Sequence, residues 1–161
     1  MIWRALEPEE AEALAAACAT FDPYLRLGYR AEALRDYFTR PDPSLDRYAI
    51  ETDGVLRGVL CLRRPWLRGP LIETLALLPE AQGRGLGSQV IIRCQAEAGR
   101  NLWATVSDFH LPARRFYARH GFVELCSLPG LVSPNETEIL LRWQARAFSD
   151  PFGSEKALES K

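Results

Sequence analysis

A glycine-rich stretch, Gln82 to Ser88, is the part of the sequence in which residue type and spacing point to ligand binding. It reads Gln82-Gly83-Arg84-Gly85-Leu86-Gly87-Ser88, with three glycines at alternate positions and one arginine. Glycine lets the backbone take positive φ and approach a ligand closely. Successive amides can then point into one concavity, where the partial positive charge of a helix N-terminus adds to theirs. The stretch therefore predicts a site for an anion, most simply a phosphate or pyrophosphate.

The residues on either side place this loop between a strand and a helix. Residues 71–78 form an apolar run interrupted by one glutamate and one threonine, which predicts a buried strand. Residues 89–98 carry apolar side chains at helical spacing, with Val90, Ile91 and Cys94 on one stripe. A helix that begins directly after the loop would point its N-terminus at the bound anion.

The spacing of the glycines distinguishes between kinds of phosphate loop. The dinucleotide-binding fingerprint needs its third glycine three positions after the second, and Ser88 stands there. Another common loop ends in Gly-Lys-Ser/Thr, a triplet that this chain lacks. The pattern Gln82-x-x-Gly85-x-Gly87 instead resembles the acyl-coenzyme-A loop of the GNAT superfamily of N-acetyltransferases, Gln/Arg-x-x-Gly-x-Gly/Ala. The alternative is an ordinary strand–helix turn in which the glycines serve close packing.

A second stretch, between Ser107 and Val123, also resembles this superfamily. Its members often carry Asn-x-x-Ala, then an aromatic-Tyr pair, then Gly-Phe. The matching positions here are Ala113, Phe116, Tyr117, Gly121 and Phe122. His110 stands where asparagine is usual, which is a departure from the pattern. Because two motifs at the expected separation are more specific than one, the chain is identified as a member of the GNAT superfamily.

The rest of the chain supplies the elements that position these motifs. Predicted strands and helices follow the order β-α-α-β-β-β-α-β-α-β-β, with a two-residue hairpin turn at Asp53-Gly54. The strands are 2–6, 47–52, 55–62, 71–78, 102–107, 122–128 and 138–143, the helices are 8–19, 30–39, 89–98 and 112–120, and 63–70 is a loop. This order is similar to that of the GNAT fold. The resemblance implies an α/β (mixed α+β) architecture with a central mixed, mostly antiparallel sheet flanked by helices.

The length of the chain bounds its domain organisation. A chain of 161 residues is long enough for one domain with a proper core. We expect a single GNAT-like, acyl-coenzyme-A-binding domain at residues 1–147. Residues 148–161 are polar and lack periodicity, which predicts a flexible C-terminal tail.

The composition limits the partners and the compartment. A formal net charge of −1 gives no general case for nucleic acid or an anionic membrane. No apolar run approaches the length that spans a bilayer, and the N-terminus lacks a secretory pattern, so we expect a cytoplasmic protein. The four cysteines, Cys18, Cys61, Cys94 and Cys126, form no Cys-x-x-Cys pair and are expected to be buried and reduced. Two histidines without a ligand cluster predict no metal site.

The resemblance implies an enzyme that transfers an acetyl group from acetyl-coenzyme A to an amine. Such a reaction needs a neutral amine, donors for the tetrahedral oxyanion, and a proton for the departing thiolate. Tyr117 matches the position where family members carry the tyrosine that protonates the thiolate. A phenol is a sensible donor to sulfur near neutral pH. The alternative for Tyr117 is a core aromatic residue.

Glu73 is the candidate base, because it is an acid inside an otherwise apolar strand. Its alternatives are a solvated strand residue or a partner for an arginine such as Arg68, and a water held by backbone carbonyls is an alternative base. The resemblance also implies contacts of the backbone with the coenzyme, by an amide near Leu75 and by strand-like pairing near Leu77. The implied coenzyme-binding residues are Leu75, Leu77, Gln82, Gly83, Arg84, Gly85, Leu86, Gly87, Ser88 and His110.

Two further groups could line the acceptor side. Residues 22–30 include Asp22, Tyr24, Arg26, Tyr29 and Arg30, in a region that commonly faces the acceptor in this fold. The loop at 63–70 holds three arginines, which could attract a carboxylate-bearing substrate. A solvated loop is the alternative for both groups.

These observations favour an acetyl-coenzyme-A-dependent N-acetyltransferase acting on a primary amine of a small molecule. The alternatives are acetylation of a protein or peptide amine, and a catalytically silent acyl-coenzyme-A-binding or sensing protein. A nucleotide-binding module fits the glycine spacing poorly. The late strands, 122–128 and 138–143, offer a surface for a homodimer.

Overall fold

The computed structural model describes residues 1–145, and its elements follow the expected order. The predicted tail at 148–161 lies outside the described residues. The strands are β1 (Ile2–Ala5), β2 (Leu45–Thr52), β3 (Val55–Trp66), β4 (Gly69–Leu77), β5 (Asn101–Ser107), β6 (Val123–Pro129) and β7 (Thr137–Gln144). The helices are α1 (Pro8–Cys18), α2 (Ala31–Thr39), α3 (Leu86–Ala98) and α4 (Leu111–Arg119), with a 3-10 turn, η1 (Pro79–Ala81).

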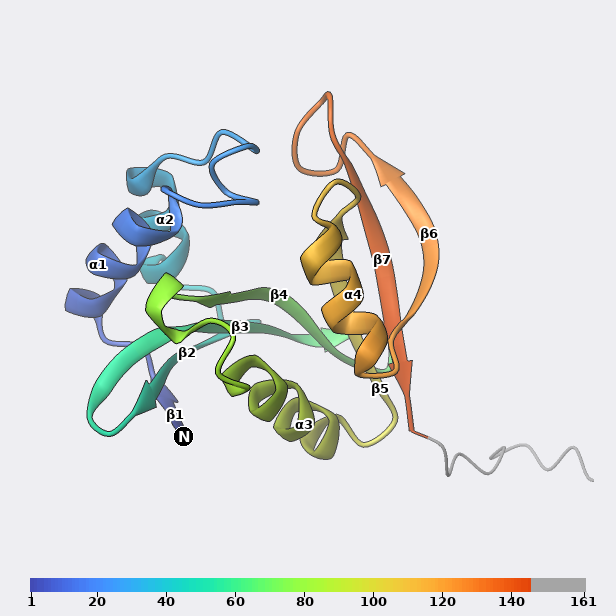
Figure 1. Ribbon diagram of the computed structural model, residues 1–161, viewed down its shortest axis with the longest axis horizontal. Coiled ribbons are helices and arrows are strands. Elements are labelled where there is room, and N and C mark those ends of the chain that lie inside the picture. Colours follow the sequence, from blue (N-terminus) through green and yellow to red (C-terminus); the bar gives the residue numbers. More distant parts are fainter. Residues whose placement is uncertain (146–161) are drawn as a thin grey trace, which may run out of the picture.

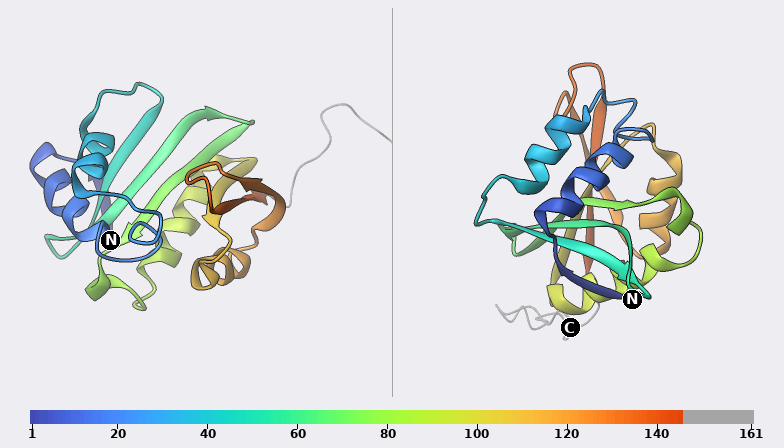
Figure 2. Two further views of the ribbon diagram at one scale, coloured as in Figure 1. Left: turned by 90° about the horizontal axis from the view of Figure 1, so that it is seen from above. Right: turned by 90° about the vertical axis from the view of Figure 1, so that its left-hand side faces the viewer.

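One seven-stranded sheet organises the molecule, in the order β1-β2-β3-β4-β5-β7-β6. Every neighbouring pair is antiparallel except β4 and β5, which are parallel. Helices α1 and α2 cover one face, and α3 and α4 cover the other (Figures 1 and 2). The expected mixed, mostly antiparallel sheet flanked by helices is therefore confirmed.

The two faces bury separate cores because side chains alternate along each strand. Leu60 and Ile72 pack with Val90 and Ile91 of α3, on the face that α4 also covers. Val59, Cys61 and Ala76 alternate with them and pack with the apolar residues of α1 and α2. The strands of the middle of the sheet are thus buried on both sides, which explains their almost continuous apolar sequence.

The sheet opens between β4 and β5. These two strands pair only at Leu71 with Trp103 and at Ile72 with Ala104. Beyond that point β4 stays paired with β3 as far as Leu77, while β5 runs on beside β7, and the two halves diverge (Figure 1). The register shift between β3 and β4 leaves Glu73 without a cross-strand partner, and such a bulge bends its strand. The edge of β4 that faces the opening is left without a β5 partner over residues 73–77.

Two expectations are corrected. The loop predicted at 63–70 is instead the end of β3 and the start of β4, joined by a short hairpin. Pro65 falls in a register irregularity between Arg63 and Trp66, where no ladder amide is needed, so it does not end the strand. Cys126 is exposed, unlike the other three cysteines, because it lies on the edge strand β6, whose residues are mostly exposed.

At Gly69 the backbones of β4 and β5 approach each other closely, where the two halves of the sheet meet. A Cβ at this position would lie 1.9 Å from the carbonyl oxygen of Asn101, the first residue of β5. We expect Gly69→Ala to lower the free energy of unfolding by about 1–3 kcal/mol, because backbone must move to relieve the overlap. Urea unfolding checks this, with Leu67→Ala as the control, since the Leu67 side chain is exposed in the same hairpin. Equal unfolding midpoints for Gly69→Ala and the unchanged protein would contradict the prediction.

Candidate active site

The glycine-rich loop has the backbone geometry that its sequence predicts. Gly83 and Gly85 have φ of +71° and +77°, and a Cβ built on either would meet no atom within 4 Å. Helix α3 starts at Leu86 with Gly85 as its N-cap, and the Gln89 amide makes the bond back to the Gly85 carbonyl. The amides before Gln89 have no partner inside the helix. The loop is open, and it presents the positive end of α3.

Among the other loop residues, some side chains are exposed to solvent and others contact the rest of the protein. Arg84 is exposed, whereas Leu86 is buried in the core. The Gln82 amide donates to the Leu77 carbonyl at 2.9 Å, which ties the loop to the end of β4. The Ser88 hydroxyl lies 3.0 Å from Nε2 of His120, and this contact joins the first turn of α3 to the end of α4. These two polar side chains therefore shape the loop through contacts with the protein itself.

Tyr117 lies in the core on the helix beside the opening. It is 7% exposed, and its ring packs edge-to-face against Phe116 and Phe122. Burial raises the pKa of the phenol well above its ordinary value, so the group is neutral and carries its proton at pH 7. Among the described residues the hydroxyl has no hydrogen-bond partner. Both expectations for Tyr117, a core aromatic and a proton donor, are compatible with this position.

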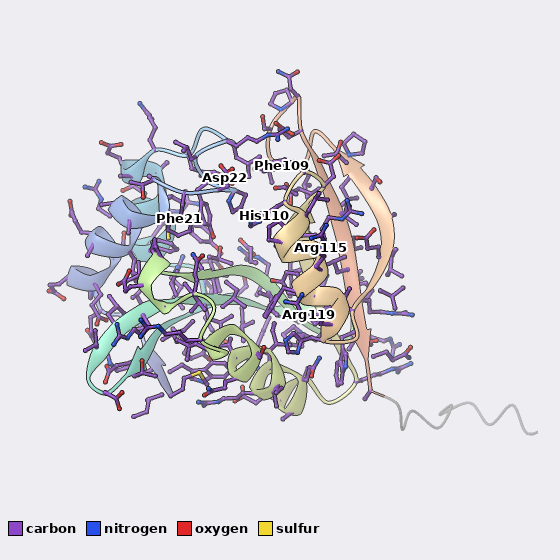
Figure 3. All side chains as sticks on the ribbon, viewed as in Figure 1. Phe21, Asp22, Phe109, His110, Arg115 and Arg119 are labelled. Carbon is purple, nitrogen blue, oxygen red and sulfur yellow. The ribbon has the colours of Figure 1, made fainter. Side chains whose placement is uncertain are left out.

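His110 caps α4 and faces the connection between α1 and α2. It is the N-cap residue, and Figure 3 shows it beside Asp22 of that connection. Burial lowers the pKa of His110, and the charge of Asp22 opposes this only in part. The imidazole is therefore neutral at pH 7 and can accept or donate a hydrogen bond. Leu75 and Leu77 pair with β3 but have no β5 partner on the other edge of β4, and both are partly buried against the core under α3.

Glu73 is held in an ion pair by Arg63. The guanidinium donates to both carboxylate oxygens, and the Nη2–Oε1 distance is 3.0 Å. The Tyr37 hydroxyl donates to the same Oε1 at 3.3 Å, and Arg63 also reaches Asp42 at 3.0 Å. Both carboxylate oxygens of Glu73 are thus engaged by side chains of the protein itself. The partner is Arg63, not the Arg68 suggested by the sequence.

Two of the three arginines before β4, Arg63 and Arg64, are paired within the protein, whereas Arg68 is exposed. Besides the Arg63 pairs, Arg64 lies 3.2 Å from Asp46 and 3.7 Å from Glu97. These carboxylates satisfy the charges that could otherwise attract an acidic substrate. Arg63 and Arg64 therefore give no support to a carboxylate-bearing acceptor.

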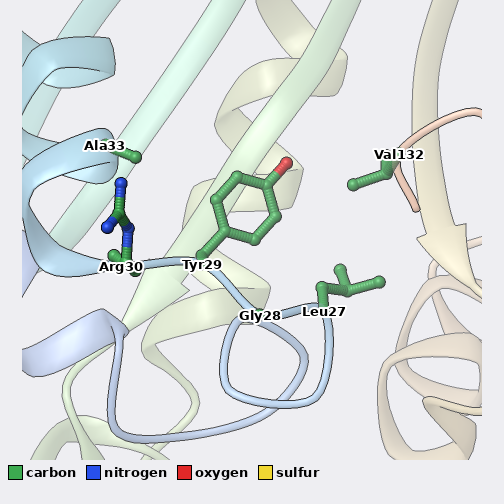
Figure 4. A pocket seen from close by; sticks show the side chains of 6 residues that line it. All are labelled: Leu27, Gly28, Tyr29, Arg30, Ala33 and Val132. Carbon is green, nitrogen blue, oxygen red and sulfur yellow. The ribbon is translucent and has the colours of Figure 1, made fainter.

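The connection between α1 and α2 lies on the face of the sheet opposite α3 (Figures 1 and 2). Arg26 pairs with Glu136 at 3.0 Å, and its guanidinium lies 3.9 Å from the ring centre of Phe109. These contacts tie the connection to the segments that follow β5 and precede β7. A cavity of about 220 Å³ lies here, between Tyr29 and Val132, as Figure 4 shows. The predicted acceptor region is thus a lined cavity on the face covered by α1 and α2.

Glu138 is a functional candidate that the two motifs do not include, and its neighbour across the strands is Ser107. They face each other on β5 and β7, with 2% and 5% of their surfaces exposed. The Ser107 hydroxyl donates to Oε1 of Glu138 at 2.6 Å. Glu138 begins an apolar strand, the same signal that singled out Glu73, so the sequence does carry a pointer to it.

Comparison with protein families identifies the family to which the chain belongs. Residues 9–122 match the model of the acetyltransferase (GNAT) family, and the chain therefore belongs to this family and is an acyltransferase enzyme. The match includes the glycine loop and Tyr117, the two motifs on which the resemblance depended. A search of curated proteins found no match.

Solved structures with the same fold include acetyltransferases of several kinds. A chimaeric spermidine N-acetyltransferase from Vibrio cholerae has a TM-score of 0.70 and 17% identity, covering 89% of this chain and 96% of that one. An aminoglycoside 6'-N-acetyltransferase complexed with coenzyme A has a TM-score of 0.68 and 12% identity, covering 93% and 100%. Ribosomal-protein-alanine N-acetyltransferase from Brucella melitensis has a TM-score of 0.63 and 13% identity, covering 90% and 100%. At these identities the likeness shows the fold alone.

Residues 1–145 offer neither a metal site nor a membrane-spanning helix. They contain no group of three or more His, Cys, Asp or Glu side chains placed to hold a metal ion. None of their helices is long and apolar enough to cross a membrane.

Proposed function

We propose that this enzyme transfers the acetyl group of acetyl-coenzyme A to a primary amine of a small molecule. The observation that carries the proposal is the opening between β4 and β5, with the glycine loop at the start of α3 on one face and a lined cavity on the other. The two substrates can then meet at the opening from opposite sides. A solved relative in fold is complexed with coenzyme A, which supports the choice of donor.

The proposed roles follow from the chemistry of each position. The amides at the start of α3 and the Arg84 charge would hold the phosphates of the coenzyme. The unpaired edge of β4 at Leu75 and Leu77 would bind the pantetheine arm as an added strand, with His110 beside it. Tyr117 would give its proton to the thiolate as the C–S bond breaks.

The size of the cavity supports a small acceptor. A volume of about 220 Å³ has room for a compact amine. Fold relatives named for spermidine and for aminoglycosides act on small amines, whereas another is named for a ribosomal protein, so acetylation of a peptide amine is the alternative. A single domain at residues 1–147, a homodimer and a cytoplasmic location stay predictions of the sequence.

Thermal melting with acetyl-coenzyme A, coenzyme A, NAD and ATP in parallel tests the donor. We expect shifts with the two coenzymes only, since a ligand at 100 times its Kd adds about 2.7 kcal/mol of stability. A shift with NAD or ATP alone would contradict the loop assignment. Release of free thiol with a panel of primary amines then separates an enzyme from a silent acyl-coenzyme-A-binding protein.

A further inference from the structure

Glu138 is a buried carboxylate without a cationic partner among the described residues. Its surface is 5% exposed, and Ser107 donates to Oε1 at 2.6 Å. The other carboxylate oxygen, Oε2, has no hydrogen-bond partner in the same part of the chain. Glu73, by contrast, is paired with an arginine. A largely buried carboxylate without a cationic partner is costly to a fold, so its presence points to a ligand that completes it.

The strand pattern places Glu138 on the acceptor side of the opening. Val106 and Ile139 pack in the core under α3 and α4. Their neighbours Ser107 and Glu138 therefore point to the opposite face, which α1, α2 and their connection cover. Ser107 is the last residue of β5, the strand that bounds the opening (Figure 1). The coenzyme loop lies at α3, so Glu138 and the coenzyme approach the opening from opposite faces.

The groups that face Glu138 make its surroundings attractive to a cation. Asp108 follows Ser107, and Glu136 precedes β7, and both act on Glu138 as like charges. The pKa of Tyr29, in the α1–α2 connection, is raised by burial and by the charges of Glu138 and Glu73. Arg26 of the same connection is engaged by Glu136, and Arg30 lines the cavity beside Tyr29. Tyr29 therefore connects the cavity with Glu138, whose charge acts on its hydroxyl.

We propose that Glu138, oriented by Ser107, binds the ammonium group of the acceptor and takes its proton before the amine attacks. This rests on the proposed function. The proton passes from nitrogen to Glu138 and then to solvent, which leaves a neutral amine. The amine nitrogen forms the C–N bond to the thioester carbon, and the C–S bond breaks. Tyr117 protonates the thiolate and regains a proton from the new amide nitrogen, so the products are the amide and free coenzyme A.

The environment of Glu138 suits it to this role better than that of Glu73. Burial and the charges of Asp108 and Glu136 raise the pKa of Glu138, against the opposing effect of the Ser107 hydrogen bond. A raised pKa makes a carboxylate a stronger proton acceptor. Glu73 accepts hydrogen bonds from Arg63 and Tyr37, so its carboxylate oxygens already have partners within the protein.

The experiment compares Glu138→Gln with Glu124→Gln, an exposed carboxylate on β6 that pairs with Arg114. Acetylation of 1,4-diaminobutane, glucosamine and glycinamide is followed by thiol release from pH 6 to pH 10. We expect Glu138→Gln to lower kcat/KM about 100-fold at pH 7, which is the size of a general-base contribution. The loss should shrink as the pH rises, because the amine then arrives neutral. Glu124→Gln should leave the rate and the pH profile unchanged.

Stability gives a readout that a structural role would move in the opposite direction. Since the pKa of Glu138 is raised in the folded state, its charge opposes folding above its ordinary value of 4.5. Glu138→Gln should therefore raise the melting temperature at pH 7.5, and this gain should disappear on going to pH 4. A fall in melting temperature at pH 7.5, or a rate loss that high pH does not relieve, would overturn the proposal.

Failure of the proposed function is distinguishable from failure of this inference. If the unchanged enzyme gives no melting shift with acetyl-coenzyme A, the donor is wrong, and Glu138 loses its role with it. If it binds the coenzyme but acetylates none of the three amines, the small primary amine is wrong, and this overturns the ammonium site as well. If it acetylates an amine and Glu138→Gln does so equally well, only the role of Glu138 fails.

Discussion

Tyr117→Phe is expected to lower turnover about 100-fold and to leave the affinity for coenzyme A unchanged. The magnitude is that of a lost general acid, since the thiolate would leave without a proton. The aromatic ring stays in place, and its packing against Phe116 and Phe122 does not depend on the hydroxyl. The hydroxyl has no hydrogen-bond partner among the described residues, so its removal costs the fold no internal bond. Steady-state kinetics with a saturating amine measure the loss.

Tyr48→Phe is the matched control. Tyr48 is a partly buried tyrosine on β2 whose ring stacks on Trp3, 5.6 Å between centres, in a part of the sheet away from α4. It should keep full turnover, and both variants should show the same melting shift with coenzyme A. Equal turnover in Tyr117→Phe and the unchanged enzyme would reduce Tyr117 to a core aromatic residue.

Local patterns along the chain predict most of this fold. Apolar runs and the Asp53-Gly54 turn fix the strands, and the glycine loop predicts the start of α3 within a few residues. The error at residues 63–70 shows the limit of such patterns. Pro65 ends a strand only if its missing amide is needed, and that depends on the register of β3 against β4, which is a long-range property.

The acceptor side depends even more on contacts between distant segments. Glu73 and Glu138 have the same local signature, an acid in an apolar strand. Their difference comes from Arg63, which the β3–β4 hairpin brings to Glu73, and from Ser107, which β5 brings to Glu138. A single sequence does not predict which of the two acids forms an ion pair with an arginine. It therefore predicts that a carboxylate serves the site and not which one.

Gly85→Glu is expected to weaken coenzyme A binding at least 100-fold. Gly85 has φ of +77°, and the space where its Cβ would lie is open, so a longer side chain would enter the space where the phosphates are expected. The new carboxylate would repel the phosphates at short range and would neutralise the positive end of α3. A left-handed backbone at a residue with a side chain also costs about 1–2 kcal/mol, so the variant should fold with reduced stability. Calorimetric titration with coenzyme A measures the affinity.

Gly99→Glu separates the charge in the loop from the strain of the backbone. Gly99 is the C-cap of the same helix, with φ of +71° and equally open space around its Cβ position. The same substitution there places the same charge at the far end of α3, and its backbone strain is larger, because Gly99 has ψ of −59° and lies outside the left-handed region that Gly85 occupies. It should melt at a lower temperature and bind coenzyme A with unchanged affinity. If both variants bind equally well, the glycine loop is a turn that serves packing; if only Gly85→Glu fails, the loop binds the phosphates.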